Sequence, residues 1–239
     1  MSELLIFLNW YLWSTLIGLV SLPIVWRFFP NLPAKGVAFA RPLGLLLWGF
    51  AFWLLGSLGI LQNDLGGVLT AFVLLIVFSV YCSAKGHFAE LKTWLKANLK
   101  TLVTMEALFF VAFALWTVVR AANPDVTYTE KPMELAFINA ILRSPGFPPL
   151  DPWLSGYAIS YYYFGYVIVS MLIRITGVIS SVGFNLSASL WFALSALAVY
   201  GIVFDLLFLR KGKAEDAPAQ PLSNARRGAF LGPLFVLLI

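Results

Sequence analysis

Four carboxylates and one lysine gather in one polar segment, residues 120–160, of an otherwise apolar chain: Asp125, Glu130, Lys131, Glu134 and Asp151. Carboxylates placed together beside a membrane can bind a divalent metal ion or act as a general base, because hard cations choose oxygen ligands. A solvated acidic outer loop explains the same composition. Ordered loops of this length are uncommon unless they have a function, so a chemical site is expected here first.

Local signals predict how this segment presents its acids. The proline after Asn123 ends the preceding helix, because proline disfavours helix in the residue before it. Thr129 can cap a new helix that runs to about Arg143, too short to span a bilayer and apolar enough to rest on its surface. The prolines that follow stiffen an extended turn that holds Asp151 and Trp153.

The tyrosine run at 161–163 then leads the chain back into the membrane. Aromatic residues collect at membrane interfaces, which explains an isolated cluster without any chemistry. Three consecutive residues point in different directions around a helix, so at least one of them is expected to face protein or a cavity.

The composition is that of a membrane protein. Hydrophobic residues make up 61% of the chain and charged residues 11%, against roughly 25% charged in a soluble domain. The net charge of +5 sits in loops, which suits a membrane surface better than nucleic acid, and no nucleic acid partner is expected. The single Cys82 excludes an internal disulfide framework. The expected location is the cell membrane, crossed several times.

About six segments have the roughly 20 apolar residues that a membrane-spanning helix needs. The expected fold class is therefore all-α, a polytopic transmembrane helical bundle. A tight turn at 62–64 joins the second helix to the third. The predicted helices lie near residues 4–26, 43–61, 65–82, 99–119, 161–179 and 184–209.

These helices divide the chain into five parts. Residues 1–119 hold four transmembrane helices and a basic interfacial helix at 88–100; 120–160 form an external loop; 161–209 hold two transmembrane helices with the tyrosine run; 210–228 are a basic loop; 229–239 are a further apolar segment. That last segment is too short to cross a bilayer. We therefore expect the chain to be the N-terminal part of a longer protein, with the remaining C-terminal helices as its partners.

Lysine and arginine in short loops mark the cytoplasmic side of a membrane protein. The loops around 27–41 and 85–100 are basic, whereas the turn at 62–64 is not, so the N-terminus and residues 120–160 are expected outside. Two further crossings would also place the basic loop 210–227 outside, against the same rule. Either the tyrosine segment dips into the membrane without crossing, or this loop is an exception. The second is preferred, because about 19 residues from Tyr161 suffice to span.

Charge also marks two of the predicted helices. The lysines of 88–100 suit a helix lying in the cytoplasmic interface, although a solvated connector explains the same pattern. Glu106 and Arg174 lie inside spans at similar depth, where an unpaired charge is costly. A Glu106–Arg174 pair is therefore predicted, either as a tie between helices or, through Arg174, as a site for a phosphorylated lipid headgroup.

Three motifs follow one another in the second half of the chain: EKPMELAF at 130–137, PPLDPWLSG at 148–156 and YYYFGY at 161–166. Together they resemble the uncharacterised multi-pass membrane family named for its YYY motif, over roughly residues 123–209. That family is similar in layout to the GT-C membrane glycosyltransferases, which use lipid-phosphate sugar donors.

The resemblance implies roles for the residues of the loop. In the GT-C enzymes a long external loop brings a catalytic acid soon after a helix, and Asp125 or Glu130 occupies that place here. The resemblance also implies that Lys131 or Arg174 meets the donor phosphate. Substrate binding is expected of six further residues: Glu134, Asp151, Trp153, Tyr161, Tyr162 and Tyr163.

Two classes of function remain open. In a glycosyltransferase, an external acid deprotonates an acceptor hydroxyl, which attacks a sugar carried on a polyprenyl phosphate; a divalent metal is a candidate cofactor. The alternative is a non-catalytic membrane scaffold or part of a transporter. A transporter would need broken helices and polar residues at mid-membrane, of which the sequence offers little beyond 56–59 and Glu106. The expected partners are the lipid bilayer and a polyprenyl-phosphate sugar.

Overall fold

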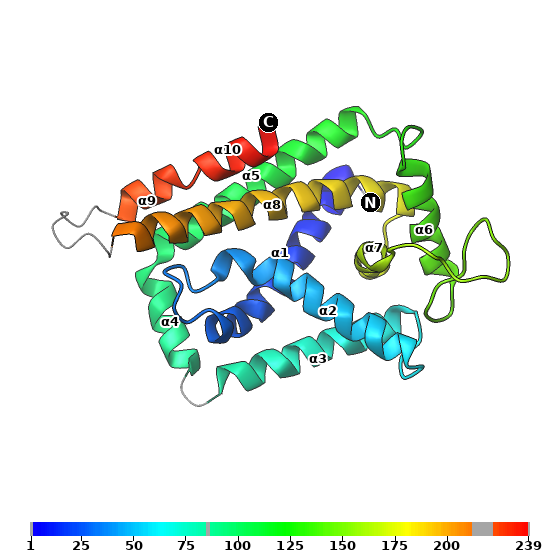
Figure 1. The fold of residues 1–239 in the computed structure, drawn as a ribbon, viewed down its shortest axis with the longest axis horizontal. Helices are drawn as coiled ribbons and strands as arrows, with labels where there is room; N and C mark the ends of the chain where they lie inside the picture. Colours follow the sequence, from blue (N-terminus) through cyan, green and yellow to red (C-terminus); the bar gives the residue numbers. More distant parts are fainter. Residues whose placement is uncertain (1, 85–86, 212–221, 239) are drawn as a thin grey trace.

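The computed structural model describes residues 2–84, 87–211 and 222–238, and its regular structure is helical (Figure 1). No strand occurs in these ranges; one isolated bridge pairs Leu150 with Ala158. The predicted all-α fold class is therefore confirmed.

Among the described residues, five helices are long and apolar enough to cross a membrane. The short 3₁₀ helix η1 (Val37–Phe39) leads directly into the second of them. Asp64 starts the third by accepting a hydrogen bond from the N–H of Gly67, directly after the turn predicted at 62–64. The five helices are α1 (Glu3–Phe28), α2 (Ala40–Ser57), α3 (Leu65–Ser83), α5 (Leu99–Ala122) and α8 (Ser180–Lys211).

The connections between these helices lie at two ends of the bundle. The basic end holds the α1–α2 turn (29–36) and α4 (His87–Ala97), and Trp26 packs there against Trp94. The loop end holds the α2–α3 turn (58–64), α6 (Lys131–Arg143) and residues 144–163. Helices α1, α3 and α8 run from the loop end to the basic end, while α2 and α5 run back (Figure 1).

Two contacts fix the direction of α8. Near its start, Asn185 accepts a hydrogen bond of 2.8 Å from Arg120 at the loop end. Near its end, the buried Asp205 accepts one of 2.8 Å from the N–H of Ala34 at the basic end. The chain therefore leaves α8 on the side of the other basic loops. The preferred expectation, that 210–227 is an exception on the opposite side, is wrong for the described parts of that segment; residues 212–221 lie outside the described residues.

The end of α8 lies at the basic end because α7 (Phe164–Thr176) does not span the bundle. It has 13 residues, about 20 Å of helix, where a spanning helix was predicted at 161–179. Gly177, in the left-handed conformation with φ 69°, ends it. Both ends lie near the loop end: Tyr163 contacts Trp53 of α2, and the carbonyl of Thr176 accepts a hydrogen bond from Asn9 of α1. Figure 1 shows α7 nearly end-on, crosswise to the long helices.

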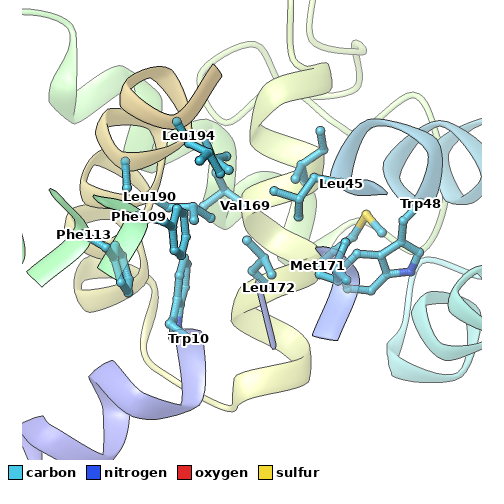
Figure 2. Packing of buried hydrophobic residues seen from close by; sticks show 14 of the residues in the cluster. Trp10, Leu45, Trp48, Phe109, Phe113, Val169, Met171, Leu172, Leu190 and Leu194 are labelled. Atoms are coloured by element: carbon cyan, nitrogen blue, oxygen red, sulfur yellow. The ribbon is translucent and has the colours of Figure 1, made fainter. Parts of the chain in front are cut away.

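Helix α7 is the centre of the core. Its residues 167–173 are all buried, and a helix that is apolar on every side must be covered on every side. Figure 2 shows Val169 pointing towards α8 and Met171 lying beside Trp48 of α2. Glycines allow this close approach, because a Cβ at Gly49 would lie 2.6 Å from Ile168. The two neighbouring long helices therefore sandwich α7.

The predicted interfacial helix at 88–100 is two helices. Helix α4 ends at Ala97 and α5 begins at Leu99, because the side chain of Asn98 bonds back to the carbonyl of Trp94 and competes with helix continuation. The amphipathic pattern is nevertheless present, with Leu91 buried and Lys92 exposed.

The segment after α8 holds two short helices within the described residues, α9 (Leu222–Gly228) and α10 (Leu231–Leu238). Helix α10 packs along α8, where a Cβ at Gly232 would lie 2.8 Å from Val199 and Val203. The predicted apolar segment at 229–239 is thus helical from Leu231; Ile239 lies outside the described residues.

Candidate functional site at the loop end

Helix α6 is fastened to the α2–α3 turn by Asn63. The side-chain amide of Asn63 donates to the carbonyls of Ile141 and Ser144 at 2.6 and 2.7 Å, and its backbone N–H donates to Pro145 at 3.1 Å. The last carbonyls of a helix need partners from outside the helix, and Asn63 supplies them. This contact fixes α6 across the end of the bundle.

The proline-rich turn after α6 uses the carboxylate of Asp151 for its own structure. One oxygen of Asp151 accepts hydrogen bonds of 2.8 Å from the N–H groups of Trp153 and Leu154. The N–H of Asp151 donates to the carbonyl of Tyr157, which closes the turn. Asp151 therefore holds Trp153 in place, and that ring meets Phe137 of α6 edge-on with centroids 5.7 Å apart.

The three consecutive tyrosines have different surroundings. Tyr163 is half-buried and accepts a hydrogen bond of 3.0 Å from the indole N–H of Trp53, which confirms that at least one of them faces protein. Tyr161 donates a hydrogen bond of 2.6 Å to the hydroxyl of Tyr162, whose side chain is exposed. The ring of Tyr161 also packs against Phe137. Tyr163 thus anchors the segment, while the other two form a pair at the surface.

Two carboxylates act on this tyrosine pair. The hydrogen bond to Tyr162, partial burial and the charges of Glu130 and Glu134 together raise the pKa of Tyr161 to about 12. Glu134 also accepts a hydrogen bond of 3.3 Å from Tyr166, and burial followed by that carboxylate raises the pKa of Tyr166. Both phenols are therefore hydrogen-bond donors at neutral pH.

Asp125 and Glu130 keep their carboxylates free. Neither carboxylate accepts a hydrogen bond or forms an ion pair with any described residue, and both side chains are exposed. The backbone carbonyl of Asp125, by contrast, accepts from two cations, Arg120 at 3.5 Å and Lys131 at 3.4 Å. Asp125 is thus held by its backbone between two positive side chains.

A groove of about 570 Å³ opens beside these cations, between α1, α5 and α8. Its walls are mainly apolar, and Leu4 and Val118 on its rim are exposed. Arg120 and Pro124 line its loop-end side. Arg120 forms no ion pair with a described residue, while Glu3 lines the groove from the first turn of α1, where the helix dipole favours an acid.

The predicted pair between Glu106 and Arg174 is wrong. Glu106 pairs with Arg41, with 2.6 Å between Nη2 and Oε2. Arg174 instead donates to the carbonyl of Leu142 at 2.9 Å and to the side chain of Asn63 at 3.4 Å, both at the loop end. The error follows from α7: because this helix does not cross the bundle, its C-terminal half lies at the other end from Glu106.

The predicted site residues therefore fall into three groups. Asp125 and Lys131 lie beside Arg120, which lines the groove, although neither of them lines it. A second group, called the aromatic group, surrounds Phe137 of α6 and Tyr166 of α7. It holds Trp153, Tyr161 and Tyr162, with Glu134 bonded to Tyr166 and Glu130 near Tyr161. The last three residues make structural contacts. Asp151 bonds to the N–H of Trp153, Tyr163 bonds to Trp53 of α2, and Arg174 bonds to the carbonyl of Leu142 on α6. Among the described residues, no three of His, Cys, Asp and Glu gather as a metal ion would require.

Arg120 and Asn185 were not predicted as site residues. Asn185 bridges the two sides of the groove end, accepting from Arg120 and donating to the carbonyl of Pro124 at 3.2 Å. A lone asparagine within an apolar span was the available signal, because a polar side chain in such a place needs a partner.

The profile of a family described as uncharacterized membrane protein (DUF2298) matches residues 47–239, which include all of the loop-end site except the α1 wall of the groove. No curated protein and no solved structure matches the chain. Because the profile covers most of the sequence, the chain belongs to the DUF2298 family of uncharacterised membrane proteins.

Proposed function

We propose that this protein is a membrane glycosyltransferase that takes a sugar from a polyprenyl phosphate at the loop end. The observation that carries the proposal is the apolar groove beside Arg120, because it combines walls for a lipid chain with a cation that has no ion-pair partner among the described residues. The resemblance of the motifs at 130–166 to the YYY motif family, and of that family's layout to the GT-C enzymes, favours the same function.

The donor phosphate would bind between Arg120 and Lys131, which already share the carbonyl of Asp125. Guanidinium groups suit phosphate oxygens, and the chain of the lipid would enter between Leu4 and Val118. In this arrangement the bond between the sugar and the phosphate lies at the level of the loop, outside the apolar part of the groove.

The general base would be Asp125 or Glu130, whose carboxylates have no hydrogen-bond or ion-pair partner within the described part of the chain. The base takes the proton from an acceptor hydroxyl, the hydroxyl oxygen attacks the anomeric carbon, and the bond from that carbon to the phosphate oxygen breaks. The leaving polyprenyl phosphate keeps the electron pair, and Arg120 and Lys131 stabilise its charge.

The acceptor would lie over the aromatic group. Trp153, Tyr161 and Tyr162 offer ring faces and hydroxyl groups at the surface, and Glu134 can accept from a sugar hydroxyl. Asp151 and Tyr163 would act by positioning this surface, and Arg174 by fixing α7 beneath it.

The orientation we propose places the loop end outside the cell membrane. Because α8 ends at the basic end, α4 and the helix ends beside 210–227 lie on the same side of the bundle. Lysine and arginine in short loops mark the cytoplasmic side of membrane proteins, so we assign this side to the cytoplasm. The lipid-linked donor would then be used on the outer face.

Binding of the donor lipid can be tested before the sugar is known. Polyprenyl phosphate should raise the melting temperature of the purified full-length protein, because a ligand that binds only the folded state stabilises it. Arg120→Gln should remove that shift. Arg143→Gln is the matched control, since Arg143 is exposed at the same end and does not line the groove. An equal shift in the parent and Arg120→Gln would refute the donor site.

Catalysis is tested by transfer of label from a panel of polyprenyl-phosphate hexoses. Asp125→Asn or Glu130→Gln should lower the rate by about 10²- to 10⁴-fold, the usual contribution of a general base. Glu90→Gln, on α4 at the opposite end, should transfer at the parental rate. Unchanged transfer in the Asp125→Asn, Glu130→Gln double variant rejects both as the base. No transfer by the parent with any donor favours the scaffold or transporter alternative.

A further inference from the structure

A second polar cluster lies inside the bundle, towards the basic end. Nη2 of Arg41 lies 2.7 and 2.6 Å from the two carboxylate oxygens of Glu106 and 3.2 Å from the hydroxyl of Thr15. Tyr11 donates a hydrogen bond of 2.5 Å to the same carboxylate. The guanidinium also lies over the ring of Phe109, 4.1 Å from its centroid. One nitrogen of Arg41 thus makes all of its hydrogen bonds.

The rest of the guanidinium has no partner among the described residues. Arg41 is 8% exposed, and neither its Nε nor its Nη1 bonds to any of them. Nε is fully buried, whereas Nη1 keeps some exposed surface. A donor left without an acceptor costs stability, and in lipid no bulk water can supply one. A bound molecule could bring an acceptor to Nη1.

A groove of about 480 Å³ reaches Arg41 and Glu106 from the surface. Its walls include Leu19 and Val103, which are exposed towards the surrounding lipid. Lys96 of α4 lines its basic-end side, is exposed, and forms no ion pair with a described residue. The groove therefore has a cation at its rim, a donor without a partner inside and apolar walls.

We propose that this groove binds an anionic glycerophospholipid from the leaflet at the basic end. The phosphate lies at Lys96, an ester carbonyl accepts from Arg41, and one acyl chain runs along Leu19 and Val103. The charge of Arg41 is already neutralised by Glu106, so the group inside must be a neutral acceptor, while the anion belongs at the rim. Ester carbonyls placed below a phosphate meet both conditions; polyprenyl phosphate has no such carbonyl.

The rim is tested by counting the phosphatidylglycerol molecules that the full-length protein retains in native mass spectrometry. Lys96→Ala should lower the retained lipid several-fold. Lys92→Ala, an exposed lysine on the same helix that does not line the groove, should not. If both variants lost the same amount of retained lipid, the lysines would be attracting anionic lipid non-specifically, and the proposal would be overturned.

The groove and the carbonyl contact are tested separately. Val103→Trp fills the groove and should abolish retention, whereas Val111→Trp, equally exposed on α5 and outside the groove, should keep it. Diether phosphatidylglycerol lacks the ester carbonyls and should bind about tenfold more weakly than the diester. Equal binding of the two lipids, no effect of Val103→Trp, or displacement by polyprenyl phosphate would each overturn the proposal. None of these measurements depends on sugar transfer.

Discussion

At the scale of single residues, the ion pair between the buried Arg41 and the partly exposed Glu106 has the clearest energetic consequence. Arg41 and Glu106 come from α2 and α5, and together with Tyr11 they bridge α1 to the same point. A charge left alone in a buried site is far more costly than the pair is favourable. The two residues are therefore interdependent, although they lie 65 positions apart.

Glu106→Ala should lower the free energy of unfolding by about 1–3 kcal/mol, because it leaves the buried Arg41 without its counter-ion, while the 41% exposure of the Glu106 side chain limits the effect. Unfolding in mixed detergent micelles measures this. Glu90→Ala removes an exposed carboxylate at the surface of α4 and should change stability by less than about 0.5 kcal/mol. Similar values for the two variants would contradict the role assigned to the pair.

Tyr162→Phe should bring the pKa of Tyr161 down from about 12 towards 10, because the hydrogen bond to Tyr162 is the first cause of the raised value. Since the folded state holds the proton more tightly, this group's stabilisation is complete below pH 10 and is lost between about 10 and 12. In the variant, this stabilisation should be lost over a narrower pH range that ends closer to pH 10. Ultraviolet titration of tyrosinate checks it; Tyr128→Phe, at an exposed tyrosine, should leave the Tyr161 step in place.

Sequence reasoning at this scale found charges but not partners. The sequence predicts that Glu106 needs a counter-ion, because an acid in an apolar helix is costly without one. Depth along the predicted helices points to Arg174 as the partner, which is wrong because α7 does not cross the bundle. The sequence pattern places Arg41 in the basic loop, whereas it lies within the first turn of α2.

At the scale of elements, α7 depends on close packing against its neighbours. Gly49 of α2 faces Ile168, and Gly183 of α8 faces Ile173, where an added Cβ would lie 2.4 Å away. Small residues at helix contacts let backbones approach in membrane proteins, where packing drives association. The two glycines therefore set the position of α7.

Gly49→Leu should destabilise the protein by about 1–3 kcal/mol, because the new side chain must displace Ile168 or α7 itself. Gly165→Leu is the matched control on α7, since a Cβ there meets nothing within 4 Å. Thermal unfolding in one detergent compares them. Loss of stability in the control alone would contradict the packing described.

The boundaries of the long helices could be predicted because each is a continuous apolar run near the length of a bilayer. The segment at 161–179 has the same composition, and hydropathy cannot separate a spanning helix from one buried crosswise. What distinguishes α7 is burial of every residue from 167 to 173 by other helices, which is a property of the packed state. The acids of the loop could likewise be predicted as candidate site residues from their chemical type alone. The groove beside Arg120 could not, because it forms only when α1, α5 and α8 pack together.

At the scale of the whole molecule, the path of α8 decides which segments share a side. Its contact from Asp205 to Ala34 brings the chain after α8 to the end that holds α4. The basic segments that the structure describes then lie together at one end of the bundle, as lysine and arginine do in membrane proteins.

Single cysteines in a Cys82→Ser background should show this arrangement in intact cells. An impermeant maleimide should label Tyr157→Cys and leave Lys92→Cys and Arg227→Cys unlabelled until the membrane is opened, because the last two belong to the basic end. All three side chains are exposed. Labelling of Arg227→Cys from outside would mean that α7 crosses the membrane after all.

The crosswise placement of α7 also bears on how the chain is made. A ribosome finishes α7 before it begins most of α8, so the growing chain carries a short apolar helix whose α8-facing side, including Val169, is still uncovered. A helix of this length is poorly suited to leave the translocon into lipid alone. Until α8 has been synthesised, α7 can pack only against the helices that precede it, such as α1 and α2. Synthesis of α8 is therefore the step that completes the core, and chains halted before it should be the ones most exposed to a quality-control protease.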